Sequence, residues 1–223
     1  PLGDLHIKAH LKGSGRLGIF PLTLDGRCKW GVIDLDGLSR AAVLALRQAG
    51  RDWGLDLPIE KSKSKGYHVW LFLDDWTPAA KVRAVLRGLI DTAGWGKHPI
   101  EIFPKQSRPN GNDGTGNGLY LPFNGLSVRE GRTLFVNLNG EQWPPYADQA
   151  AYLAATARTT EAQLDALIEV HGLVVEDSST PRASHVEGDP PSKGTRLPLP
   201  PCAAAAYAEG VEEPGRNLWA HFL

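Results

Sequence analysis

Alternating apolar and polar residues predict a series of short β-strands along the first two thirds of the chain. In the most regular one, the odd positions from Tyr67 to Leu73 and the even positions from His68 to Phe72 fall on opposite faces, because successive side chains of a strand alternate. Asp25-Gly26 is typical of a hairpin turn between two such strands. The predicted strands are 17–22, 29–35, 58–61, 67–73, 100–103, 119–123 and 133–136.

Apolar residues at helical spacing predict helices between and after these strands. One begins at Thr77-Pro78, since Thr is a favourable N-cap and Pro suits the first helical position. Another has a capping box from Thr160 to Gln163 and a C-cap at Gly172. The predicted helices are 38–53, the one from 77 onward, 146–158, 161–171 and 202–210.

Composition excludes several classes of protein. The 223 residues carry a formal net charge of −1, so any nucleic-acid binding must use local basic patches. Cys28 and Cys202 are far apart and form no CxxC, which supports neither a disulfide framework nor a zinc knuckle and favours a reducing, cytoplasmic location. No apolar run approaches the roughly 20 residues that span a membrane, and the start lacks a signal-peptide pattern.

Three regions are predicted along the chain. Residues 1–173 hold the predicted strands and most of the predicted helices, 174–200 are rich in Pro, Ser and charge like a linker, and 201–223 begin another unit with a helix. The chain contains no methionine and ends inside an apolar segment, so we expect a piece of a longer protein. The loop 104–118 is long for a compact domain, which is typical of functional or mobile loops.

Asp34-Leu35-Asp36 is the strongest chemical signal. Both carboxylates end an apolar strand and point the same way, while Leu35 points into the core. A divalent cation with hard oxygen ligands would offset their repulsion. The alternative is a solvated turn, which is how we interpret the second acid pair, Asp74-Asp75.

Three further groups accompany the acid pair. Lys63, Ser64 and Lys65 precede Gly66 and His68, a combination that suits a polyphosphate but also fits an exposed soluble loop and a core histidine. Glu101, inside an apolar strand, either joins Asp34 and Asp36 at a metal or faces water. Lys105 and Arg108, after Glu101, either bind phosphates or are solvated. Lys12 and Arg16, near the N-terminus, either bind a nucleic-acid backbone or belong to a frayed end.

In order and spacing, these segments resemble the archaeo-eukaryotic primase superfamily, in its bacterial primase-polymerase branch of mobile elements and of defence systems such as CRISPR-associated ones. The resemblance covers about 11–124, and a weaker one covers the tail from Pro201 to Asn217. Its carriers are Gly18–Leu22, Cys28–Gly37, Lys61–Trp70, Glu101–Gln106 and Gly116-Asn117 before Leu119–Pro122.

The resemblance implies an α/β (α+β) fold, in which an α/β module packs on an RNA-recognition-motif-like antiparallel sheet with flanking helices. It assigns metal binding and catalysis to Asp34, Asp36 and Glu101, which would hold two Mg²⁺ or Mn²⁺ ions roughly 4 Å apart. His68 matches the family's phosphate-contacting histidine, and Lys105 its triphosphate-contacting lysine. Gly66 stands where the family usually has serine, so Ser64 is the candidate replacement.

The residues and the resemblance together predict a primase-polymerase that transfers a nucleotide from an NTP or dNTP to a 3′-hydroxyl. Lys63, Ser64, Lys65, His68 and Lys105 would bind the nucleotide, and Lys12, Arg16 and Arg108 a single-stranded or primed DNA template. Further domains, helicases or defence-system components are expected partners, and no membrane is. Two other functions stay open: a non-catalytic nucleotide or single-strand binding module, and a metal-dependent nuclease.

Overall fold

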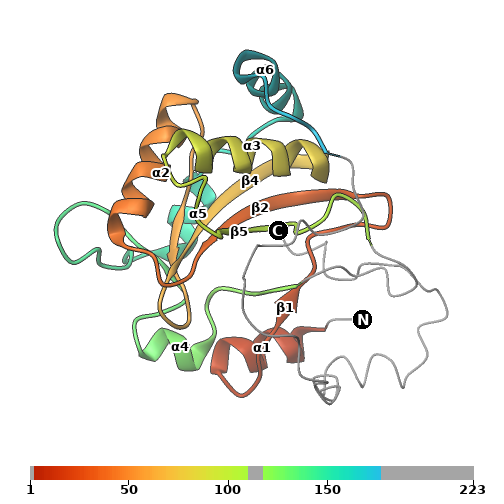
Figure 1. Cartoon of the computed structure of the whole chain (residues 1–223). Helices are drawn as coiled ribbons and strands as arrows, with labels where there is room; N and C mark the ends of the chain where they lie inside the picture. The colour runs from red at the N-terminus through yellow and green to blue at the C-terminus, as the bar shows by residue number, and fades with distance from the viewer. Residues whose placement is uncertain (1–2, 110–117, 177–223) are drawn as a thin grey trace, which may run out of the picture.

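A five-stranded antiparallel sheet with strand order β5-β2-β4-β3-β7 forms the centre of the computed structural model, which describes residues 3–109 and 118–176 (Figure 1). A second sheet pairs β1 with β6. The strands are β1 Gly18–Ile19, β2 Arg27–Leu35, β3 Ile59–Lys61, β4 Tyr67–Pro78, β5 Glu101–Phe103, β6 Leu119–Tyr120 and β7 Leu134–Phe135. The helices are α1 Asp4–Lys12, α2 Arg40–Asp52, α3 Ala79–Thr92, α4 Gly125–Arg129, α5 Gln149–Ala155 and α6 Glu161–His171.

One face of the main sheet packs against α2 and α3 (Figure 1). The alternation in β2 and β4 directs Ile33 and Leu35, with Val69 and Leu71, into this layer, and all four are fully buried. Helix α6 lies on the outer side of α3, where Lys81 pairs with Glu161 at 2.7 Å. The confirmed alternation thus separates an aliphatic face from a second, chemically different face.

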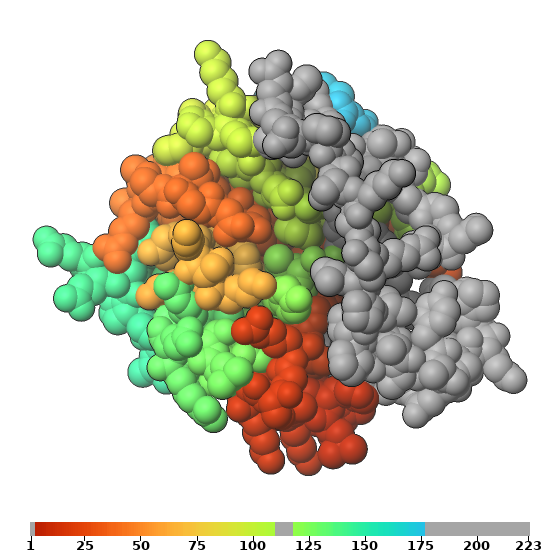
Figure 2. All heavy atoms as spheres, turned by 60° about the horizontal axis from the view of Figure 1, so that its bottom comes forward, coloured from red at the N-terminus to blue at the C-terminus, as the bar shows by residue number. Residues whose placement is uncertain are grey.

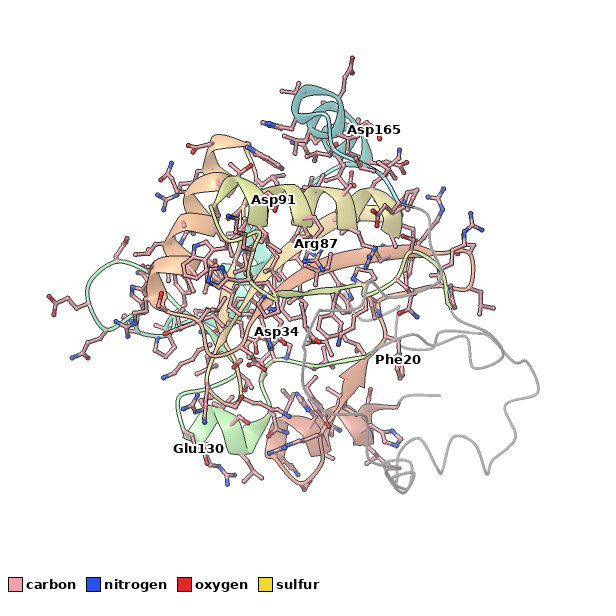
Figure 3. The ribbon with its side chains drawn as sticks, in the orientation of Figure 1. Phe20, Asp34, Arg87, Asp91, Glu130 and Asp165 are labelled. Carbon is pink, nitrogen blue, oxygen red and sulfur yellow. The ribbon has the colours of Figure 1, made fainter. Side chains whose placement is uncertain are left out.

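The second face is aromatic and carries polar groups at one end. Trp30 and Trp70 lie 5.4 Å apart between ring centroids, and Phe72 and Phe135 extend the same cluster. Side chains of β1 and β6 and of α5 cover it. Figure 3 shows Asp34 on this side of the sheet and Arg87 on the α3 side.

The predicted hairpin between 17–22 and 29–35 is wrong. The turn exists, with Gly26 donating to the carbonyl of Thr23, but β1 pairs with β6 instead of β2. Both edges of β2 are already occupied by β4 and β5, and Pro21 has no N–H to offer a ladder.

The predicted helix start at Thr77-Pro78 is shifted. Thr77 and Pro78 still pair with Cys28 and Arg27, so β4 continues through Asp74-Asp75 to Pro78, and α3 begins at Ala79. Non-local pairing with the start of β2 therefore overrides the local capping signal. Asp74 and Asp75 are exposed, as expected for a solvated pair.

Two helices were not predicted. The N-terminal segment, one of whose interpretations was a frayed end, forms α1, and α4 lies against it (Figure 2). His10 anchors α1 because its Nε2 lies 2.8 Å from the carbonyl of Pro122 and its Nδ1 accepts from the Leu17 amide. A Cβ at Gly125 would collide with the Leu11 carbonyl, so glycine permits this close approach.

The remaining predictions fall into two groups, those that the described residues test and those that lie outside the described residues. The mixed α/β class is confirmed, as are the helices near 38–53 and 161–171, the capping box from Thr160 to Gln163 and the left-handed Gly172 cap. The helix 202–210, the region 201–223, most of the linker 174–200 and residues 110–117 of the long loop lie outside the described residues. Within 3–109 and 118–176, no helix is long and apolar enough to cross a membrane.

Candidate functional site

Four polar residues form one row across the aromatic face of the sheet. Asp34 of β2 stands opposite Glu101 of β5 on one side and opposite His68 of β4 on the other, and His68 in turn stands opposite Glu60 of β3. Directly opposed side chains of neighbouring strands share a face and lie about 5 Å apart at Cβ. Strand pairing thus collects four titratable groups from four segments of the sequence.

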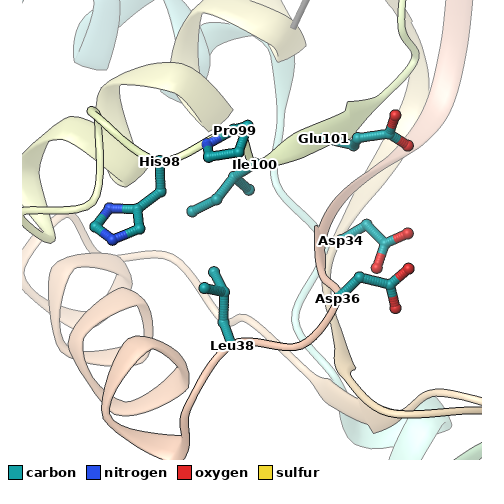
Figure 4. A pocket seen from close by; sticks show the side chains of 7 residues that line it. All are labelled: Asp34, Asp36, Leu38, His98, Pro99, Ile100 and Glu101. Carbon is teal, nitrogen blue, oxygen red and sulfur yellow. The ribbon is translucent and has the colours of Figure 1, made fainter. Parts of the chain in front are cut away.

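Asp36 completes the acidic group just past the end of β2. Asp34, Asp36 and Glu101 line one cavity of about 150 Å³, and Figure 4 shows the three carboxylates directed to the same side. His98 lines the same cavity but turns its ring away from the acids, toward Trp95, at 4.5 Å between centroids. The three predicted acids therefore share one cavity.

Asp34 occupies an unfavourable electrostatic position. Its side chain is only 15% exposed, and burial, together with the charges of Asp36 and Glu101, raises its pKa from 3.8 to about 6, while His68 and Lys105 oppose the rise. The Oδ1 atom of Asp34 is buried and has no hydrogen-bond partner. A group that must be ionised here needs a cation.

The donor set fits a divalent cation by its chemistry, because hard carboxylate oxygens are the ligands that Mg²⁺ and Mn²⁺ prefer. The buried, unpartnered Oδ1 of Asp34 supports this fit. Lys105 currently holds Glu101, at 2.8 Å between Nζ and Oε2. Among the described residues, no three His, Cys, Asp or Glu side chains converge closely enough to bind one ion, so metal binding would need a rearrangement of side chains.

His68 is fixed by Glu60. The His68 Nδ1 lies 2.9 Å from Glu60 Oε2, while Nε2 lies 3.7 Å from Asp34 Oδ1. Burial lowers the pKa of His68, but the hydrogen bond and charge of Glu60, aided by Asp34, outweigh burial and raise that pKa above its ordinary value. His68 is buried, as a core histidine would be, yet it lines a cavity.

This second cavity, of about 210 Å³, adjoins the first at Asp34 and Asp36. Of the three candidate loop residues, Lys63 and Ser64 line it, whereas Lys65 is exposed and does not. Lys63 lies over the Tyr120 ring at 4.2 Å, and the Ser64 carbonyl accepts from Arg132. Figure 2 shows the surface where the segment around 60–66, the residues after 118 and the N-terminal residues lie side by side.

Several residues of the second cavity were not predicted from the sequence. Glu60, Ser62 and Thr133 line it and are buried, and the Thr133 hydroxyl has no partner within the described residues. For Glu60 a signal existed, since an acid beside Ile59 in a short apolar strand needs a partner. Nothing local marks Ser62 or Thr133, because their exposure to the cavity depends on how β3, β4 and β7 pair.

Gly66 contacts the protein itself. A Cβ here would collide with the Leu35 carbonyl oxygen and lie 2.9 Å from the carbonyl carbon. The Gly66 amide donates to Ser62 Oγ at 3.1 Å. This glycine therefore seats the Lys/Ser loop against the end of the strand that carries Asp34.

The remaining basic candidates are spread over the molecule. Lys12 and Arg16 are exposed at and after the end of α1. Arg108 is exposed beside Gly26, which precedes the first residue of β2 and so lies at the opposite end of that strand from Asp34. Arg108 is thus separated from the acids by the length of β2.

Removing the charge of Asp34 is expected to stabilise the fold. Because its pKa is higher in the folded protein than the 3.8 of an ordinary Asp, the folded state binds the proton more tightly, and stability falls as pH rises from about 4 to 6. Asp34→Asn should raise the free energy of unfolding by about 1–3 kcal/mol near pH 8 and have little effect below about pH 4. Urea unfolding at both pH values measures this difference, and a loss of stability near pH 8 would contradict it.

Comparison with known proteins agrees with this geometry. The model of a family described as the archaeo-eukaryotic primase domain of the TOTE conflict system matches residues 1–167. The match includes every residue of the polar row and both cavities. A comparison with curated proteins finds no match to the chain. The chain therefore belongs to the archaeo-eukaryotic primase superfamily, which is nucleotidyltransferase-like, as a domain of the conflict-system type.

Proposed function

We propose that this domain is a primase-polymerase, which transfers a nucleotide from an NTP or dNTP to a 3′-hydroxyl under the direction of a template. One observation carries the proposal: Glu101, Asp34 and His68 lie in register on three neighbouring strands, at the junction of two cavities. Acids on one side and a phosphate-binding side chain on the other are what nucleotidyl transfer requires.

The acidic side of the row would receive the divalent cations that the superfamily generally uses. Bound to Asp34, Asp36 and Glu101, two Mg²⁺ or Mn²⁺ ions would supply Lewis-acid activation of the 3′-hydroxyl and neutralisation of the triphosphate. The same three carboxylates would exclude other anions from the cavity until a cation arrives, because their own repulsion is already unfavourable.

The basic side would hold the triphosphate. His68 lines the second cavity together with Lys63 and Ser64, and its Nε2 would be the atom that contacts phosphate. Lys105, now paired with Glu101, would contact phosphate oxygens as charge shifts toward the leaving pyrophosphate. Lys65 would act from the exposed loop as a more distant charge.

The template, single-stranded or primed DNA, would follow the basic side chains on the outside of the domain. Lys12 and Arg16 are exposed at and after the end of α1, which adjoins α4 and reaches the carbonyl of Pro122 through His10. Arg108 would contact nucleic acid only where it passes the far end of β2. Further domains of a longer chain, or other conflict-system components, would complete the assembly.

Replacing Lys105 by methionine is expected to weaken nucleotide binding. The change keeps the length of the side chain and removes its charge, so KM for the nucleotide should rise roughly tenfold, the value of one charge-assisted contact. Lys29→Met is the matched control, since Lys29 lies over the Trp76 ring near the far end of β2, at 5.5 Å. An equal rise in KM for both variants would contradict a specific role for Lys105.

Incorporation of a labelled nucleotide on a primed template, with Mg²⁺ or Mn²⁺ and with a chelator, tests the proposed function. We expect template-dependent extension that the chelator abolishes. Nucleotide or single-strand binding without incorporation would favour a binding module, and degradation of the template without nucleotide addition would favour a nuclease. Either result would overturn the proposal.

A further inference from the structure

We infer that Glu60 is a positioning residue, which fixes the imidazole of His68 so that its Nε2 faces the nucleotide's phosphates. The inference rests on the proposed function, because it adds a residue that acts on the phosphate-binding His68. It starts from a buried acid that no other part of the proposed chemistry uses.

Glu60 is 1% exposed, and a single oxygen of its side chain receives two donors. Its Oε2 lies 2.9 Å from His68 Nδ1 and 2.8 Å from Trp70 Nε1. The indole N–H can only donate. A carboxylate can only accept, so Nδ1 of His68 carries its proton toward Glu60.

Side-chain packing and strand pairing restrict the movement of Glu60 and its two hydrogen-bond partners. Trp70 is 1% exposed and stacks on Phe72, with 5.4 Å between ring centroids. The backbones of β3 and β4 pair Glu60 directly with His68. The carboxylate is therefore held from one side by a fixed indole and presents its oxygen to the imidazole at a fixed place.

The hydrogen bond at Nδ1 also determines where the other ring nitrogen of His68, Nε2, points. Nε2 of His68 lies 3.7 Å from Asp34 Oδ1, too far for a hydrogen bond, and His68 lines the second cavity. A ring held at Nδ1 keeps Nε2 aimed into that cavity, where the imidazolium, which carries a proton on each nitrogen, would donate to a phosphate oxygen from a fixed position. Without Glu60, the imidazole would be free to rotate about its side-chain bonds.

A purely structural role is the competing explanation for Glu60. A buried carboxylate is a poor choice for packing alone, because its burial is unfavourable unless its partners are fully satisfied. If Glu60 only tied β3 to β4, its replacement would lower stability and leave nucleotide affinity and the state of His68 unchanged. The two roles therefore predict different measurements.

Glu60→Gln is the test, with Glu161→Gln as the control. Both remove one carboxylate, but Glu161 lies on α6, where it pairs with Lys81 of α3, away from the site. For Glu60→Gln we expect the affinity for a non-hydrolysable nucleoside triphosphate to fall roughly tenfold. We expect KM to rise more than kcat falls, and the ¹⁵N NMR shifts of the His68 ring to move. Unchanged ring shifts, or unchanged affinity, would overturn the inference.

The wild-type protein supplies a second measurement, which does not depend on how the variant folds. Its ¹⁵N spectrum without nucleotide should show Nδ1 of His68 protonated and hydrogen-bonded, and an unprotonated Nδ1 would overturn the inference. The NMR and binding measurements are also independent of turnover. If the domain incorporated no nucleotide, the proposed function would fail, while the NMR and binding results would still decide the role of Glu60.

Discussion

Replacing Asp34 and Asp36 together by alanine is expected to lower nucleotide incorporation by at least about 10³-fold and to leave the fold intact. The two carboxylates are the centre of the acidic group, and Asp34 belongs to both cavities. Their removal leaves Glu101 alone, already paired with Lys105. The ionised Asp34 side chain does not stabilise the fold, since its pKa is raised by burial and by like charges.

The control for this experiment is the second acid pair. Asp74 and Asp75 are exposed near the far end of β4, and the only hydrogen bond between their side chains and the described residues is from the Trp76 amide to Asp75. Their replacement by alanine removes the same charge and should leave incorporation within about twofold of wild type. Full activity in the folded Asp34/Asp36 variant, measured by primer extension, would refute the assignment of these residues.

Gly66→Ser is expected to destabilise the protein by about 1–3 kcal/mol. The primase family usually has serine at this position, so the resemblance alone favours the change. The structure opposes it, because the added Cβ would collide with the carbonyl of Leu35 and lie 3.0 Å from Cα of Asp36. The backbone of β2 cannot give way without moving Asp34, so incorporation should fall as well.

Urea unfolding at neutral pH measures this effect, with Gly15→Ser as the matched control. A Cβ at Gly15 meets only Cβ of Ala9, at an ordinary 3.5 Å, so the control should change stability by no more than about 0.5 kcal/mol. A Gly66→Ser variant that is as stable as wild type and more active would show that serine fits this loop, and the close approach of Gly66 to β2 would then be unimportant.

The local features of the sequence determined the elements of the fold. Alternation in 67–73 identified β4 and its two faces, and Thr160, Gln163 and Gly172 marked both ends of α6. The Asp34-Leu35-Asp36 spacing put Leu35 in the core and both acids beside one cavity. Such patterns depend on residues a few positions apart, so they can be interpreted without knowing where the chain goes next.

The pairing of distant segments was decided only by the tertiary structure. The register that sets Glu101 and His68 on either side of Asp34, and Glu60 behind His68, depends on contacts between strands far apart in sequence. A slip of one residue in any of these pairings would turn the side chains to the other face. The same non-local pairing removed the expected hairpin at β1 and made Gly66 a contact with β2. The sequence alone thus determined which side chains are available and which way each faces along its strand, while the pairing of the strands determined which of them meet.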